Sequence, residues 1–161
     1  MTERGPADWE QLVGGVDFGE GPRWHEGRLW YSDFYQRAIY SVGAGGDRRV
    51  EHGDLPDRPS GLGWLPDGDL LAVMMTERRV VRFDRGGAVH PHADLAGIAT
   101  WHCNDMVVTD TGIAYVGNFG FDLEHRRSFA TATLARVDPD GAATAAAADM
   151  RFPNGSVITP D

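Results

Sequence analysis

Three stretches of the sequence resemble one another, and their anchor positions recur at intervals of 40 to 50 residues. Two of the stretches share a Gly-x-x-Trp segment followed by Gly-x-Leu, and each combines short β-rich runs with glycine-containing turns. The anchors are Trp24, Trp64, Val108 and Ile158, the last of which opens a fourth stretch. A repeat of this length with about four short strands is typical of the blades of a β-propeller.

The repeat predicts an all-β protein whose blade-like units begin at about residues 21, 61, 105 and 155. No segment shows the apolar period of an amphipathic helix, and we expect the alanine-rich stretch 142–148 to be a strand or a loop. The expected domain is a partial propeller over residues 12–161, about three and a half blades in an open arc, after an N-terminal leader at 1–11. The alternative is an ordinary β-sandwich in which the similarity arose by chance.

Composition excludes several classes of function. The 161 residues carry a formal net charge of −9, contain no Lys and include one Cys. Without Lys there is neither a Schiff-base lysine nor a P-loop lysine, and one Cys allows no internal disulfide or Cys-rich zinc site. The negative charge and the lack of a basic run argue against nucleic acid and anionic membranes as partners.

Targeting and membrane signals are missing from the sequence. The first ten residues contain four charged side chains and no apolar segment of the kind found in signal peptides. The longest strongly apolar run, Leu70–Met75, is far too short to span a bilayer. We therefore expect a cytoplasmic protein.

One position of the repeat is polar in all four units, where it holds Glu20, Ser60, Asn104 and Asn154. The inner strand of each propeller blade begins beside the central channel, so equivalent positions converge on the axis. One carboxylate and two amide oxygens suit Ca²⁺ or another hard divalent cation. Each residue taken alone could instead serve a turn, because Asn and Gly are common turn residues. Their shared position favours a metal site.

Other candidate residues are expected to be structural. His90 and His92 flank a proline, which favours an exposed loop. Cys103 should be a small buried side chain, and nothing in the sequence identifies a base that would activate it. Trp24 and Trp64 should pack in the core between blades. The sequence contains no Gly-x-Ser-x-Gly, His-Glu-x-x-His or Gly-x-Gly-x-x-Gly motif.

Three motifs occur in order along the chain: Phe18–Trp24, Cys103–Asp105 and Phe152–Gly155. Together they resemble motifs of the senescence marker protein/gluconolactonase family, which includes regucalcin and luciferin-regenerating enzyme, and the resemblance extends from about Leu12 to Asp161. It implies a six-bladed propeller that holds a divalent metal in its central channel. It also implies hydrolysis of sugar lactones or related cyclic esters, with a small lactone or ester as the partner molecule.

The resemblance implies roles for individual residues. Glu20 corresponds to the metal carboxylate, Asn154 to a metal-binding asparagine, and Asn104 to an asparagine that contacts metal, substrate or both. His102 stands where many lactonases have an arginine and is expected, with Asn104, to bind substrate. Ca²⁺ is the expected cation, with Zn²⁺, Mg²⁺ or Mn²⁺ as alternatives. The remaining metal ligand is an aspartate that also serves as general base, and it is expected beyond Asp161. The catalytic residue is therefore unassigned.

Three functions follow as hypotheses. The first is a metal-dependent lactonase, in which a cation polarises the lactone carbonyl and a carboxylate activates water. The second is a non-catalytic binding module, because a propeller fold does not by itself fix a function. The third is an inactive truncated fragment, whose open sheet edges would allow self-association.

Overall fold

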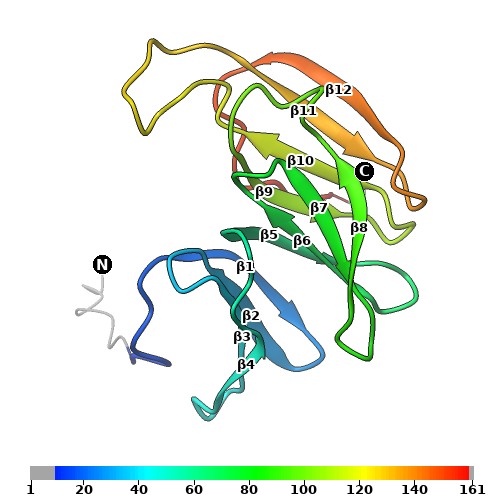
Figure 1. Cartoon of the computed structure of the whole chain (residues 1–161). Helices are drawn as coiled ribbons and strands as arrows, with labels where there is room; N and C mark the ends of the chain where they lie inside the picture. Colours follow the sequence, from blue (N-terminus) through cyan, green and yellow to red (C-terminus); the bar gives the residue numbers. More distant parts are fainter. Residues whose placement is uncertain (1–9, 160–161) are drawn as a thin grey trace, which may run out of the picture.

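The computed structural model describes residues 10–159, which form twelve strands and no helix (Figure 1). The strands make three antiparallel sheets of four, each built in chain order. The first sheet contains β1 (Gly19–His25), β2 (Arg28–Asp33), β3 (Ala38–Val42) and β4 (Arg48–His52). The second contains β5 (Pro59–Trp64), β6 (Leu70–Met74), β7 (Arg79–Phe83) and β8 (Val89–Asp94). The third contains β9 (Cys103–Val108), β10 (Ala114–Asn118), β11 (Ala132–Val137) and β12 (Ala143–Met150). The predicted all-β class is confirmed.

The ends of the chain and the alanine-rich stretch bear on three further predictions. The predicted leader at 1–11 lies almost wholly outside the described residues, as do the last two residues of the predicted fourth unit. The part of that unit that the structure describes, 155–159, contains no strand. The alanine-rich stretch forms β12, which is one of its two predicted outcomes.

Within residues 10–159, no helix is long and apolar enough to cross a membrane.

The first strands of the three sheets, β1, β5 and β9, pack side by side. The Ser32 hydroxyl lies 3.1 Å from the carbonyl oxygen of Glu20 in β1 and 2.7 Å from that of Ser60 in β5. Gly61 in β5 lies so close to the backbone of β9 that a Cβ there would clash with the amide nitrogen of Met106. Inner strands joined at equivalent positions are the arrangement of propeller blades. The three described sheets therefore form part of a β-propeller, as an open arc rather than a closed ring (Figure 1).

Hydrophobic side chains fill the two spaces between neighbouring sheets. Ile39, Leu62 and Phe83 are at most 1% exposed and lie in the cluster between the first and second sheets. Leu71 and Met106 are fully buried in the cluster between the second and third sheets. Fully burying a side chain of this size stabilises a fold by about 1.5–3 kcal/mol. This packing holds the sheets together and so fixes where the inner strands begin relative to one another.

The two tryptophans at repeat anchors have different surroundings. Trp64 packs edge-to-face against Trp30 beside the first core cluster, with ring centroids 5.3 Å apart. Trp24 is 66% exposed, so its predicted place in the core is wrong. It lines a surface depression together with Trp64 of β5, Val107 of β9 and Asp110 of the turn after β9. The repeat identifies equivalent positions, but it does not say which neighbouring sheet covers each of them.

The predicted loop around His90 and His92 is also wrong, because both residues lie in β8. This strand forms one edge of the second sheet and pairs only with β7. Pro91 lies opposite Val81, next to a shift in the register of the two strands. An edge strand tolerates proline because one side of its backbone needs no partner in the sheet.

Candidate functional site

Three of the four residues at the polar position of the repeat occupy the same place in their strands. Glu20, Ser60 and Asn104 are the second residues of β1, β5 and β9, so their shared register is present in the fold. The three inner strands pack together at equivalent positions, so these residues lie at the same end of the three strands. We call this end the channel mouth. It is the region where the sequence predicted a cation.

Asn104 has the most unusual environment at the channel mouth. Its side chain is nearly fully buried, yet neither Nδ2 nor Oδ1 has a hydrogen-bond partner among residues 10–159. Gly117 lies opposite, where a Cβ would come within 2.5 Å of Asn104 Oδ1. An unpaired buried polar group costs about 1–3 kcal/mol, so a side chain in this state calls for an explanation. A ligand that binds the amide would supply one.

Glu20 brings negative charge to the same end. Burial is the largest cause of its raised pKa, and the charge of Asp105 adds to it. Asp105 accepts a hydrogen bond of 2.8 Å from Nη2 of Arg23, a residue of β1, and this contact ties the first inner strand to the third. A cation beside Glu20 would stabilise its ionised form, because opposite charges lower a carboxyl pKa.

The side chain of Asn154 is not brought to Asn104. Asn154 is exposed, and its Oδ1 accepts a hydrogen bond of 3.1 Å from the amide of Gly155, as the turn interpretation expects. Its backbone passes close by, because the carbonyl oxygen of Pro153 lies against Gly117 together with Asn104 Oδ1. The preceding Phe152 stacks on Phe119 at a centroid distance of 4.7 Å and fixes the segment there. The structure thus places the segment beside the site, with the Asn154 amide bonded to its own turn.

The donors at the channel mouth fit a hard divalent cation. Glu20 supplies a carboxylate and Asn104 a buried amide oxygen without a partner, and such cations prefer oxygen ligands. In the part of the chain that the structure describes, no group of three or more His, Cys, Asp or Glu side chains is placed to hold a metal. A site here would therefore depend on amide oxygens as well as on the Glu20 carboxylate.

His102 lies beside the channel mouth in a groove of about 520 Å³. We call this the Arg58 groove, and its lining residues are Arg37, Pro56, Asp57, Arg58, Thr76, His102 and Glu124. The imidazole of His102 stacks on Trp101 at a centroid distance of 4.7 Å. Burial is the main cause of its lowered pKa, so His102 is neutral near pH 7.

Sequence reasoning missed Arg58 as a residue of this region. Its Nη1 donates a hydrogen bond of 2.6 Å to Oε1 of Glu124, which lies in the loop after β10. The signal was present in the repeat, because Arg58 stands two residues before Ser60 just as His102 stands two residues before Asn104. Glu124 carried no such signal, because it lies in a loop between two strands of the third sheet.

Cys103 is fully buried, and burial raises the pKa of its thiol to about 12. The thiol is therefore protonated near neutral pH and has no nucleophilic character. The prediction of a small buried side chain is confirmed.

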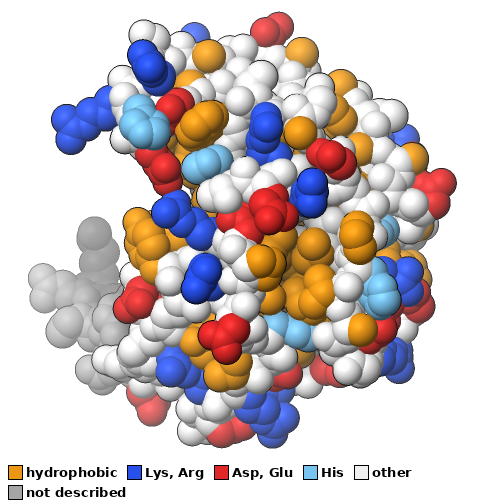
Figure 2. All heavy atoms as spheres, viewed as in Figure 1, with side chains coloured by type: hydrophobic (Ala, Val, Ile, Leu, Met, Phe, Trp, Pro, Cys, Tyr) orange, Lys and Arg blue, Asp and Glu red, His pale blue; other side chains and the backbone are white. Residues whose placement is uncertain are grey.

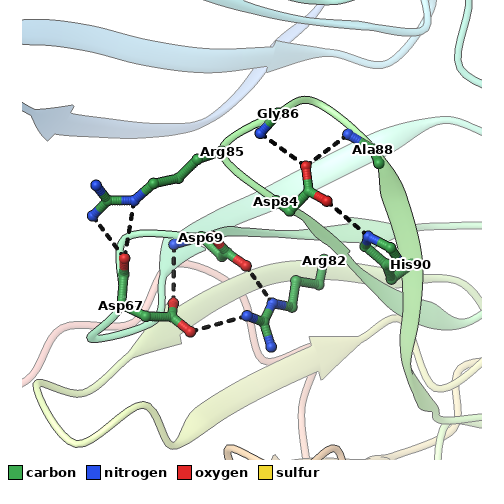
Figure 3. A network of polar contacts seen from close by, with 8 residues as sticks. All are labelled: Asp67, Asp69, Arg82, Asp84, Arg85, Gly86, Ala88 and His90. Atoms are coloured by element: carbon green, nitrogen blue, oxygen red, sulfur yellow. Dashed lines mark hydrogen bonds and ion pairs between the residues drawn. The ribbon is translucent and has the colours of Figure 1, made fainter.

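The opposite end of the second sheet carries a polar network in which each carboxylate has partners (Figure 3). Asp69 and Asp67 accept hydrogen bonds of 2.5 Å and 2.9 Å from the Arg82 guanidinium. Asp84 accepts two backbone N–H groups of its own turn and lies 3.0 Å from Nε2 of His90. These bonds lower the pKa of Asp84, and the bond to Asp69 raises the pKa of Arg82. We call these five residues the turn network, and its bonds hold the turns of the sheet.

Charged side chains are interspersed over the face of the molecule seen in Figure 2. Arg and acidic groups stand close to one another there, with hydrophobic side chains gathered between them. The net charge of −9 is therefore not concentrated in one continuous acidic surface on this face.

Comparison with known families finds one match that covers most of the chain. Residues 18–161 match the model of the SMP-30/gluconolactonase/LRE-like region. A search of curated proteins finds no match.

Solved structures share the fold. A gluconolactonase from Xanthomonas campestris is 22% identical with a TM-score of 0.70, and the match covers 85% of this chain and 49% of that one. The calcium-binding protein regucalcin from Agrobacterium tumefaciens is 23% identical with a TM-score of 0.65, covering 83% and 44%. A virginiamycin B lyase from Staphylococcus aureus is 15% identical with a TM-score of 0.56, covering 79% and 39%. The chain spans about half or less of the length of these structures. Because a lyase shares the fold, the fold alone does not select a reaction.

Proposed function

Because the chain belongs to the SMP-30/gluconolactonase/LRE-like family, we propose that it forms part of a metal-dependent hydrolase that opens a small lactone or a related cyclic ester. The observation that carries this proposal is the Asn104 amide, which is buried at the channel mouth and has no hydrogen-bond partner in the described part of the chain. Glu20 occupies the equivalent position of β1, and its pKa is raised by burial and by the charge of Asp105.

In this proposal Glu20 and Asn104 hold the cation. Asn154 joins them when its side chain turns away from Gly155, since the backbone of Pro153 already lies beside Asn104. Ca²⁺ is the first candidate, because oxygen ligands suit it and the similar structure from Agrobacterium tumefaciens is described as calcium-binding. Zn²⁺, Mg²⁺ and Mn²⁺ are the alternatives.

The bound cation would act as a Lewis acid that polarises the lactone carbonyl. Asn104 is a neutral ligand, so its amide oxygen leaves more of the cation's charge available than a second carboxylate would. Its Nδ2 remains a donor for a substrate oxygen, which matches the expected double role of this residue. Hydrolysis adds water to the carbonyl carbon and breaks the ring C–O bond, which gives a hydroxy acid. The aspartate expected as general base is not among the described residues.

Calorimetric titration with Ca²⁺ tests the proposal, with Asn104→Ala as the variant and Asn118→Ala as its matched control. Both asparagines lie in the third sheet and are buried, but Asn118 bonds to the carbonyl of Thr133 and to the amide of Gly120. We expect Asn104→Ala to weaken cation binding by about tenfold or more, since removing a group that supports a metal site has effects of this size. Asn118→Ala should leave the affinity unchanged.

Two results would favour the other hypotheses. If the wild type and Asn104→Ala bound the cation equally well, the polar residues of the repeat would serve only to form turns. This result would favour a non-catalytic binding module. Cation binding without lactone opening would agree with an inactive fragment. An assay of lactone hydrolysis with and without a chelator separates these outcomes.

A further inference from the structure

The Arg58 groove lies at the same end of the inner strands as the channel mouth. Arg58 immediately precedes β5 and His102 immediately precedes β9, so the groove joins the starting ends of two inner strands. Its volume of about 520 Å³ is sufficient for a small organic molecule. A ligand bound at Asn104 would have this groove beside it.

The acidic groups of the groove have little capacity left for a ligand. Asp57 is 5% exposed and accepts three hydrogen bonds, from the backbone amides of Thr76 and Glu77 and from the Thr76 hydroxyl. Its carboxylate therefore serves the turn that follows β6. Glu124 uses Oε1 for Arg58, so it is the acidic group that a ligand at Arg58 must displace.

Donors are in excess in the same groove. Arg58 uses Nη1 for Glu124, and no hydrogen bond of its Nε or Nη2 is found among residues 10–159. The Arg37 guanidinium has no ion pair or hydrogen bond with any described residue. The hydrogen-bond donors of the groove that have no partner among residues 10–159 therefore belong to the two guanidinium groups of Arg58 and Arg37.

The bond between Arg58 and Glu124 is of a kind that a ligand can exchange. The two side chains are 37% and 45% exposed. Ion pairs at such exposure contribute little to stability. A ligand carboxylate can therefore take the place of Glu124 at small cost, and the planar guanidinium can bind it through two parallel hydrogen bonds.

We propose that the Arg58 groove binds a carboxylate of the substrate, with Arg58 as the residue that contacts it and Arg37 as a second positive charge. This inference rests on the proposed lactone hydrolysis and narrows its substrate class to a lactone that carries a carboxylate besides the ring ester. Ring opening of such a lactone gives a dicarboxylate. The lactone ring lies at Asn104 and the added carboxylate lies in the groove.

Binding of D-glucarate to the chelator-treated protein tests this inference without any metal. D-Sorbitol, which has the same carbon chain and no carboxylate, is the comparison, and tryptophan fluorescence and calorimetry are the readouts. We expect glucarate to bind at least about tenfold more tightly than sorbitol. Arg58→Leu should weaken glucarate binding by about tenfold or more, in line with the strength of charge-assisted hydrogen bonds. Arg49→Leu, at an exposed arginine of β4 outside the groove, is the control and should change nothing.

Glu124→Gln separates a binding role of Arg58 from a structural one. Removing the competing carboxylate should tighten glucarate binding by about two- to fivefold, whereas a merely structural ion pair predicts no change or weaker binding. Undetectable glucarate binding to the wild type, or equal binding by Arg58→Leu, would overturn the inference. If glucarate binding depends on Arg58 but Ca²⁺ does not bind, the metal proposal fails while the groove stands. If Ca²⁺ binds and glucarate does not, the reverse holds.

Discussion

The channel mouth and the turn network lie at opposite ends of the second sheet, and their polar side chains differ in the partners they have. At the turn network, Asp67 and Asp69 accept hydrogen bonds from the Arg82 guanidinium, and Asp84 is bonded to the His90 imidazole (Figure 3). At the channel mouth, neither amide atom of Asn104 has a hydrogen-bond partner among residues 10–159, and Glu20 lies in the field of another carboxylate. Bonded polar groups stabilise the fold, whereas a buried polar group without a partner needs an explanation such as a ligand or an ordered water.

The largest effect is expected from a substitution that adds an atom in the narrow space between the inner strands β5 and β9. In Gly61→Ala the new Cβ would meet the backbone of Met106, so β5 and β9 would have to separate. We expect the free energy of unfolding to fall by about 3 kcal/mol, the upper part of the range for overpacking. Chemical denaturation measures this. Gly97→Ala is the control, because its Cβ would meet nothing within 4 Å. Equal stability of the two variants would show that the inner strands do not pack as described.

A smaller effect should distinguish a paired from an unpaired asparagine. Asn118→Ala removes an amide that bonds to Thr133 and Gly120, so we expect a loss of about 1–3 kcal/mol in the metal-free protein. Asn104→Ala removes an amide without a partner and should cost much less, or even raise stability. Thermal or urea unfolding in the presence of a chelator is the measurement. A greater loss for Asn104→Ala would mean that its amide has a structural partner and would end the contrast.

The smallest effects should appear in the pH dependence of stability, with opposite signs at the two ends. The pKa of Glu20 is raised from 4.5, so its contribution is fully present below that pH and is lost as pH rises through the folded-state pKa. The pKa of Asp84 is lowered from 3.8, so its contribution is present above that pH and is lost as pH falls through the folded-state pKa.

Glu20→Gln should therefore gain stability over the wild type as pH rises above about 4.5 in the metal-free protein. Asp84→Asn should lose stability relative to the wild type near neutral pH, and this difference should shrink in acid below about 3.8. Urea unfolding at a series of pH values measures both. The quantity to compare is the unfolding free energy of each variant relative to the wild type. If this difference changed with pH in the same direction for both variants, the assigned surroundings of the two carboxylates would be contradicted.

Much of the fold could be predicted from the repeat, because blades of a propeller reuse one pattern of strands and turns. The repeat also aligned Glu20 and Asn104, since equivalent positions of inner strands meet at one end. It could not show that Trp24 is exposed, because periodicity does not identify the covering neighbour. The pairing of Arg58 with Glu124 depends on a loop that has no counterpart in the repeat. The cytoplasmic location, the leader at 1–11 and self-association through sheet edges stay predictions.

The most direct test of the central claim uses Mn²⁺ as a paramagnetic cation and follows asparagine side-chain amides by NMR. We expect substoichiometric Mn²⁺ to broaden the Asn104 amide and the backbone signals of Glu20 first. Signals of Asp67 and Asp69 should remain sharp. Broadening that begins at the turn network, or that spares Asn104 at saturating Mn²⁺, would contradict the claim that the unpaired amide is a cation ligand.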